Sequence, residues 1–373
     1  MKRRLRRLAV ATTWWCVLGS AGSTAAEPPP VLAYASLPAF AEPRLSPDGH
    51  RMAVLRPLHD VQHAFVMDLT SGHATPLLAA DPSQHFINHC DWANADRLVC
   101  SIRIYGEIQT GQNYTRYRDN RTTFTRMIAV DADGGNRMRL IPAPVNREAG
   151  EQKWNPVDQD DVISWMRQDP EHILVQLNRD DRVRPSVYRL NIYTNELKRV
   201  RQSHDTIYRW YADPQGNLRF AVGYRNFEPV AFSVSGNRAI PVDVSHFADV
   251  YQPSVIGATT DGKRAYAGSY YGGNRYRIHE VDVKSGQVIR TLFADPDYDI
   301  FGGRLLLDER TNKPLLLEYW HGAHLLLLQC PQGGAETHRL DLPGHRRRGR
   351  TGDHSLRCLR RPPDHRLSHG ASR

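Results

Sequence analysis

The sequence has little of what characterises helical, membrane-embedded or disulfide-rich proteins. Its 373 residues include 5 Cys, too few for a scaffold held together mainly by disulfides. The apolar run Leu8–Leu18 is too short to span a bilayer comfortably. No stretch keeps a helical hydrophobic period over more than two turns. The 27 Gly and 24 Pro are scattered singly, which favours many short strands joined by turns.

The body of the chain has no excess of basic residues, although the formal net charge is +9. The excess comes from the basic residues of Lys2–Arg7 and from the arginines of residues 345–373, and the segment between them is slightly acidic. A body without a positive excess lacks the electrostatic footprint of a nucleic-acid-binding protein. We therefore expect no nucleic-acid partner.

The N-terminal 26 residues have the organisation of a secretory signal peptide. A basic start is followed by the apolar run and then by small residues that end in Thr24-Ala25-Ala26. We expect 1–26 to be removed, the mature protein to be periplasmic or secreted, and no membrane span to remain after cleavage. The alternative is a short membrane anchor.

Export would place the four remaining cysteines in an oxidising compartment. Cys90 and Cys100 flank the short turn Asn94–Asp96, the spacing of two strands in a hairpin, so we predict a disulfide between them. The alternative is a pair of buried free thiols. A metal site is disfavoured because two cysteines supply too few ligands.

A unit of four strands recurs along the chain. In the first unit, strands flank the turn Ser46–Gly49 and a second turn follows near Gly72. Five more units have the same organisation. The first turns of the six units contain, in order, Asp48, Asn94, Asp169, Asp213, Asp261 and Asp308. Four of the five intervals are 44–48 residues long, and the second is 75 residues long.

Repeats of this length with alternating strands predict an all-β fold, a β-propeller of about six to seven four-stranded blades with disordered termini, the last blade being complete or incomplete. Residues 27–340 would form the propeller domain. A β-sandwich or a solenoid is the alternative. The extra residues of the long interval fall in 105–123 and 143–160, which we interpret as projecting loops.

The segment Leu45–Ala53 (LSPDGHRMA) carries a family resemblance. Together with Leu37–Phe40, the cysteine pair around Trp92 and Phe301–Pro314, it resembles the N-terminal propeller domain of secreted bacterial serine peptidases of the prolyl oligopeptidase family, in the dipeptidyl aminopeptidase and acylaminoacyl peptidase branch. The resemblance covers about residues 31–330, and TolB-like propellers are similar more loosely.

In that family, an α/β-hydrolase domain with a Ser-Asp-His triad follows the propeller, which restricts substrates to peptides. This sequence has no Gly-x-Ser-x-Gly nucleophile elbow, so we assign no catalytic residue. The resemblance implies the substrate-gating propeller of an exported serine peptidase, inactive alone, whose partner is a peptide substrate or a hydrolase domain missing from this chain. The alternative is a stand-alone TolB-like periplasmic propeller that binds a protein or peptide.

Residues 341–373 form a basic tail without strand or helix period, which predicts disorder. We hypothesise that it is an out-of-frame translation product, with the reading frame lost before the propeller closes. The alternative is a basic tail that binds nucleic acid or an anionic membrane.

The loop 105–118 is the best sequence candidate for binding, because it is long, aromatic and polar, and loops on rigid scaffolds often carry function. We select Tyr105, Glu107 and Tyr114 as possible peptide-binding residues, with Glu107 as a partner for an amine. The alternative is a solvated insertion.

Metal and cofactor motifs are weak. Three histidine pairs have ligand-like spacing without further ligands: His59 and His63, His321 and His324, and His365 and His369. Four aspartates are interpreted as turn caps rather than ligands: Asp131, Asp133, Asp261 and Asp282. We expect no metal and no cofactor.

Overall fold

The computed structural model describes residues 39–107, 121–144, 154–202, 204, 206–245, 255–301, 304–321, 324–329 and 337–340. Every helix or strand assigned within these residues is a β-strand. None of the described segments forms a helix long and apolar enough to cross a membrane. The expected signal peptide and basic tail, together with Tyr114, lie outside the described residues.

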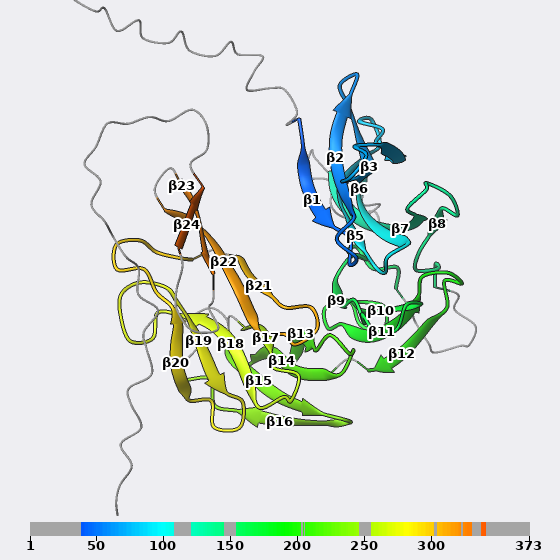
Figure 1. Cartoon of the computed structure of the whole chain (residues 1–373). Coiled ribbons are helices and arrows are strands. Elements are labelled where there is room, and N and C mark those ends of the chain that lie inside the picture. The colour runs from blue at the N-terminus through cyan, green and yellow to red at the C-terminus, as the bar shows by residue number, and fades with distance from the viewer. Residues whose placement is uncertain are drawn as a thin grey trace, which may run out of the picture. The chain divides into compact units, whose positions relative to one another are not determined.

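The strands form six antiparallel sheets of four, each in chain order (Figure 1). The first sheet contains β1 (Ala41–Leu45), β2 (Arg51–Leu58), β3 (Val61–Asp68) and β4 (Ala74–Ala79). The second contains β5 (His85–Trp92), β6 (Arg97–Glu107), β7 (Arg121–Asp131) and β8 (Met138–Arg139). The third contains β9 (Val162–Ser164), β10 (His172–Leu177), β11 (Ser186–Asn191) and β12 (Leu197–Arg201).

The fourth sheet contains β13 (Ile207–Ala212), β14 (Leu218–Arg225), β15 (Glu228–Ser235) and β16 (Arg238–Val242). The fifth contains β17 (Val255–Ala258), β18 (Arg264–Ser269), β19 (Arg277–Asp282) and β20 (Val288–Phe293). The sixth contains β21 (Arg304–Leu307), β22 (Pro314–His321), β23 (His324–Gln329) and β24 (Thr337–Leu340). The six repeat units of the sequence correspond to these six sheets. The fold is therefore all-β, with the sheets as blades of a β-propeller.

Consecutive sheets bury their facing side chains in five apolar clusters, one for each neighbouring pair. Strand β10 shows how one strand supplies two of them. Ile173 and Val175 belong to the cluster shared with the second sheet, whereas Leu174 belongs to the cluster shared with the fourth. Successive strand residues point to opposite faces, so a sheet packed on both sides is apolar at adjacent positions.

The first turn of each sheet is closed by the carboxylate or amide predicted from the repeat. Each side chain accepts a hydrogen bond from a backbone N–H two residues ahead, as in an Asx turn. The six acceptors are Asp48, Asn94, Asp169, Asp213, Asp261 and Asp308. The hydroxyl of Ser46 and the amide of His50 lower the pKa of Asp48 to about 2.

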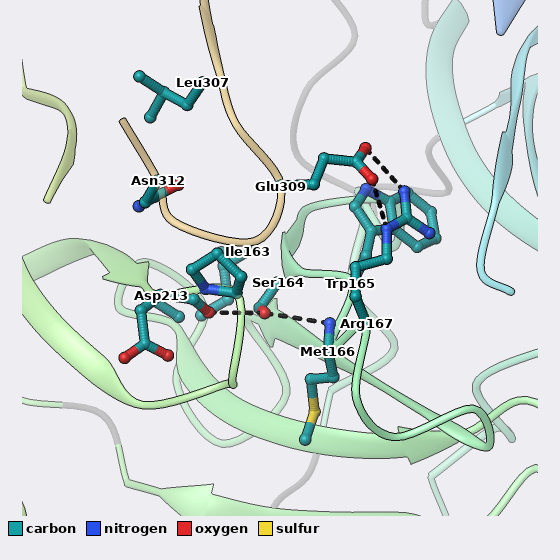
Figure 2. A pocket seen from close by; sticks show the side chains of 11 residues that line it. Ile163, Ser164, Trp165, Met166, Arg167, Asp213, Leu307, Glu309 and Asn312 are labelled. Atoms are coloured by element: carbon teal, nitrogen blue, oxygen red, sulfur yellow. Dashed lines mark hydrogen bonds and ion pairs between the residues drawn. The ribbon is translucent and has the colours of Figure 1, made fainter. Parts of the chain in front are cut away.

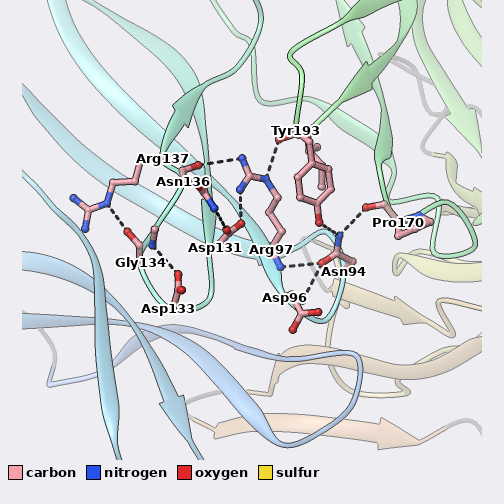
Figure 3. Close-up of polar contacts among 12 residues, drawn as sticks. Asn94, Asp96, Arg97, Asp131, Asp133, Gly134, Asn136, Arg137, Pro170 and Tyr193 are labelled. Atoms are coloured by element: carbon pink, nitrogen blue, oxygen red, sulfur yellow. Dashed lines mark hydrogen bonds and ion pairs between the residues drawn. The ribbon is translucent and has the colours of Figure 1, made fainter.

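Three of the four aspartates interpreted as turn caps have that role: Asp133, Asp261 and Asp282 accept backbone N–H bonds. Asp131 has a different role, because its carboxylate on β7 pairs with a side chain of the neighbouring strand β6. Its carboxylate pairs with the buried guanidinium of Arg97 and accepts a 2.6 Å bond from the amide of Asn136 (Figure 3).

Part of the segment 105–123, which the sequence predicts to be a loop, consists of paired strands. β6 continues to Glu107 and β7 begins at Arg121, and the two residues are register partners at the end of an 11-residue pairing. Some of the extra residues of this interval therefore lengthen the pairing of β6 with β7. Tyr105 and Glu107 are strand residues, and residues 108–118 of the expected binding loop lie outside the described residues.

Candidate functional site

A cavity of about 150 Å³ lies where the first strands of three sheets end (Figure 2). The residues come from the ends of β9, β13 and β21 and from the turns that follow these strands. Its lining consists of Ile163, Ser164, Trp165, Met166, Arg167, Ala212, Asp213, Pro214, Leu307, Glu309 and Asn312. The lining is mostly apolar, with a few charged and polar groups, as in sites for organic ligands.

Several polar groups of the lining are already bonded within the protein. Ser164 Oγ donates a 2.8 Å bond to the carbonyl oxygen of Asp213 and accepts the backbone N–H of Met166. The amide of Asn312 donates a 2.6 Å bond to the carbonyl oxygen of Ala258. The buried carboxylate of Asp213 accepts bonds from its own turn and from Arg219. These groups shape the cavity rather than offering free hydrogen-bonding capacity.

Met166, whose side chain lines the cavity, has an unusual backbone conformation. Its φ is 45°, in the left-handed region that non-glycine residues seldom adopt. A Cβ added at Gly216, which itself has a φ of +82°, would lie 3.0 Å from Met166 Cε. Glycine at 216 therefore provides both the turn conformation and the space that Met166 occupies.

Arg167 and Glu309 form a two-pronged ion pair at the cavity. Nε and Nη2 of Arg167 donate bonds of 2.7 Å and 2.8 Å to the two carboxylate oxygens of Glu309. Nη1 donates to the carbonyl oxygens of Trp92 and Ala93 in the second sheet. One guanidinium therefore joins the first-strand ends of the second, third and sixth sheets.

The residues selected from the sequence as a peptide-binding loop lie at the end of the second sheet that is opposite to its first turn. β6 begins at Arg97, next to the first turn, and runs for 11 residues to Glu107. Tyr105 is 47% exposed, and its ring packs edge-on against Phe86 with ring centroids 5.8 Å apart. The described structure brings neither Tyr105 nor Glu107 into the cavity lining.

The two cysteines predicted to form a disulfide are joined. Cys90 on β5 and Cys100 on β6 are direct register partners, and a disulfide connects them. Both are buried in the cluster between the first and second sheets. Among the described residues, no group of three or more His, Cys, Asp and Glu side chains is arranged to hold a metal ion.

A second cavity, of about 490 Å³, lies beside the segment that leads into β9. The guanidinium of Arg182 stacks over Trp154 at 3.4 Å from the ring centroid. Asp158 also lines the cavity, and burial, followed by the charges of Asp160 and Asp161, raises the pKa of its carboxyl. Residues 145–153, which precede this segment in the sequence, lie outside the described residues.

Sequence reasoning missed the cavity because its residues are separated by more than 140 positions. A signal was nevertheless present in the repeat. Trp165–Arg167, Ala212–Pro214 and Leu307–Asn312 occupy equivalent places around the first turns of the third, fourth and sixth units. The repeat register alone could have placed these three segments at the same end of their sheets.

No protein-family model matches the chain, and no curated protein matches it. Several solved structures have a similar fold. The acylaminoacyl peptidase of Pyrococcus horikoshii aligns over 82% of this chain and 44% of its own, at a TM-score of 0.45 and 16% identity. The propeller domain of the trilobed protease of Pyrococcus furiosus aligns over 81% of both chains, at 0.45 and 14%.

TolB of Acinetobacter baumannii aligns over 78% of this chain and 51% of its own, at a TM-score of 0.32 and 11% identity. The chain spans less than half the length of the acylaminoacyl peptidases that it matches. These identities are below 25% and these TM-scores are below 0.5, so the alignments carry no conclusion about this chain, and its assignment as a β-propeller rests on its own six four-stranded sheets.

Proposed function

We propose that this chain is a peptide-binding propeller and that it holds one apolar side chain of the peptide in the cavity of Figure 2. The observation that carries the proposal is the lining itself. Trp165, Met166, Pro214 and Leu307 supply apolar surface, and the ion pair of Arg167 and Glu309 supplies polar groups beside it. A cavity of about 150 Å³ is large enough for a group the size of benzene.

Within this function, the sequence resemblance favours the gating propeller of an exported serine peptidase of the prolyl oligopeptidase family. Its support is the motif Leu45–Ala53, whose turn is closed by Ser46 and Asp48. A TolB-like propeller that binds a protein or peptide without chemistry is the second candidate. Sequencing the gene beyond codon 310 in all three frames separates them, because only the peptidase hypothesis requires a Gly-x-Ser-x-Gly elbow downstream.

Export is part of the proposal. Its support is the signal-peptide pattern of residues 1–26 together with the disulfide between Cys90 and Cys100, because disulfides persist in oxidising compartments. Fractionation of cells that produce the full chain tests it. A periplasmic or secreted protein cleaved near residue 26 is expected, and an uncleaved cytoplasmic protein would contradict export.

Peptide binding is tested by titrating the protein with N-acetyl-Ala-Ala-Phe-amide and N-acetyl-Ala-Ala-Asn-amide in a calorimeter. The phenylalanine peptide is expected to bind about tenfold more tightly, because only its side chain gains from leaving water. Ala212→Leu fills part of the cavity and should abolish the difference.

Ala239→Leu is the matched control. Ala239 belongs to the same sheet and packs against the same apolar cluster as Ala212, but it does not line the cavity. It should leave the preference for phenylalanine unchanged. Equal affinity for the two peptides in the unaltered protein would overturn the proposed function.

A further inference from the structure

We propose that the cavity of Figure 2 binds the carboxyl-terminal residue of a peptide, with the apolar side chain inside the cavity and the free carboxylate on Arg167 in place of Glu309. The inference rests on the proposed peptide-binding function and deepens it by specifying which end of the peptide is recognised and by which side chain.

The guanidinium of Arg167 is positioned by contacts that do not involve Glu309. Its Nη1 donates to the carbonyl oxygens of Trp92 and Ala93 at the end of β5, and its Cζ lies 5.8 Å from the ring centroid of Trp165. These contacts leave Nε and Nη2 facing Glu309 as a planar fork. Such a fork matches a carboxylate, which accepts both bonds at once.

Glu309 is a replaceable occupant of that fork. Its side chain is 62% exposed, whereas that of Arg167 is 20% exposed. The turn that carries it is closed by other groups: Asp308 accepts the N–H bonds of Arg310 and Thr311. Exposed ion pairs are weak because each charge is well solvated when separated. Another carboxylate can therefore take the place of Glu309 without disturbing the turn.

The remaining lining of the cavity fits the rest of a terminal residue. The polar atoms of Ser164 and Asn312 are bonded within the protein, so the space beside Arg167 is bounded mainly by apolar side chains. A carboxyl-terminal residue carries an apolar side chain and a carboxylate on the same Cα. An internal acidic residue lacks this combination, because its only carboxylate is on the side chain that would fill the cavity.

The test compares N-acetyl-Ala-Ala-Phe as the free acid with the same peptide as its amide, by calorimetry at low salt. The acid is expected to bind about tenfold more tightly, because only a carboxylate forms the charged pair of bonds with Arg167. The advantage should shrink as salt is added, since screening weakens a partly exposed ion pair.

Glu309→Gln is the diagnostic variant, because it weakens the internal competitor for Arg167. It should tighten binding of the acid about two- to fivefold relative to binding of the amide. Glu318→Gln is the matched control: Glu318 lies in the same sheet, on β22, and does not line the cavity. It should alter neither affinity.

Arg167→Lys keeps the positive charge but removes the planar fork, and it should abolish most of the preference for the acid. This variant is informative only if its near-ultraviolet circular dichroism spectrum matches that of the unaltered protein. If the spectra differ, the result for Glu309→Gln decides. Equal affinities for acid and amide, or an acid affinity that Glu309→Gln does not raise relative to the amide, overturn the inference while leaving peptide binding intact. Binding of neither peptide overturns both proposals.

Discussion

His279 is a neutral imidazole in the interior of the fifth sheet. It lies on β19 with 1% of its surface exposed, its Nδ1 is 3.2 Å from the hydroxyl of Thr291, and its ring meets that of Tyr271 edge-on. Burial, followed by the charge of Arg277, lowers the pKa of His279 to about 4. A protonated imidazole at this position would be a buried cation.

This burial predicts a loss of stability in mild acid. Between pH 6.5 and about 4, the unfolded chain binds a proton at this histidine and the folded chain does not, so unfolding becomes easier as the pH falls through this window. The expected contribution is about 2 kcal/mol. Urea denaturation at pH 7 and pH 4.5 measures it.

His279→Gln removes the titration and should reduce the change in the free energy of unfolding between those two pH values. His73→Gln, at an exposed position in the turn before β4, is the matched control and should keep the change. An equal loss of stability in both variants and in the unaltered protein would show that other groups control the acid response.

At the scale of the strand and its turns, Arg97 joins the second and third sheets (Figure 3). Its guanidinium pairs with Asp131 and donates to the carbonyl oxygens of Asn136 in its own sheet and Ile192 in the next. Its Cζ lies 4.7 Å from the ring centroid of Tyr193. The arginine is 2% exposed, so water cannot replace these bonds.

Arg97→Met should destabilise the protein by about 3 kcal/mol, because it removes the charge that pairs with the Asp131 carboxylate and the donor to two carbonyl oxygens. Thermal denaturation followed by circular dichroism gives the shift. Arg137→Met is the control: Arg137 lies on the same turn but donates to Gly134 at an exposed position, and its loss should cost less than about 0.5 kcal/mol. Similar shifts for the two variants would contradict the proposed role of Arg97.

The hairpin of β5 and β6 contains the disulfide, whose two cysteines are 10 residues apart in the sequence. Closing so short a loop in the unfolded chain is expected to stabilise the protein by about 2–3 kcal/mol. Thermal melting with and without a reductant checks this, with the Cys90→Ala and Cys100→Ala double variant as the control that should no longer respond. A melting temperature unaffected by reduction would contradict the prediction.

At the scale of the whole molecule, stability comes from apolar clusters between sheets rather than from any single sheet. Ile173 and Leu174 are neighbours on β10, yet each is buried in a different cluster. A sheet covered on only one face could not bury both, since successive side chains point to opposite sides. The two residues therefore report separately on the two interfaces of the third sheet.

Ile173→Ala and Leu174→Ala should each cost about 2–5 kcal/mol, because each leaves a cavity in a packed interface. Ile289→Ala, on β20 with 46% exposure, is the matched control and should cost much less. Chemical denaturation of the three variants compares them. A small effect at either position of β10 would mean that the corresponding interface contributes little to folding.

Local sequence determined much of this fold because its signals are short-range. Asp or Asn at the first turn closes each hairpin by bonding to a backbone N–H two residues away, which requires no distant partner. The pairing of Cys90 with Cys100 follows from the same hairpin geometry. The repeat of such hairpins was sufficient to predict four-stranded blades.

Only the tertiary structure decided where a ligand could bind. Arg167 and Glu309 are 142 residues apart, and nothing in the sequence near either residue indicates the other. They meet because sheet packing brings the ends of β9 and β21 to one cavity, whose lining also includes Trp165 and Leu307. Turn chemistry depends on neighbours in the chain, whereas a cavity depends on how complete sheets pack, and a short-range pattern does not contain that information.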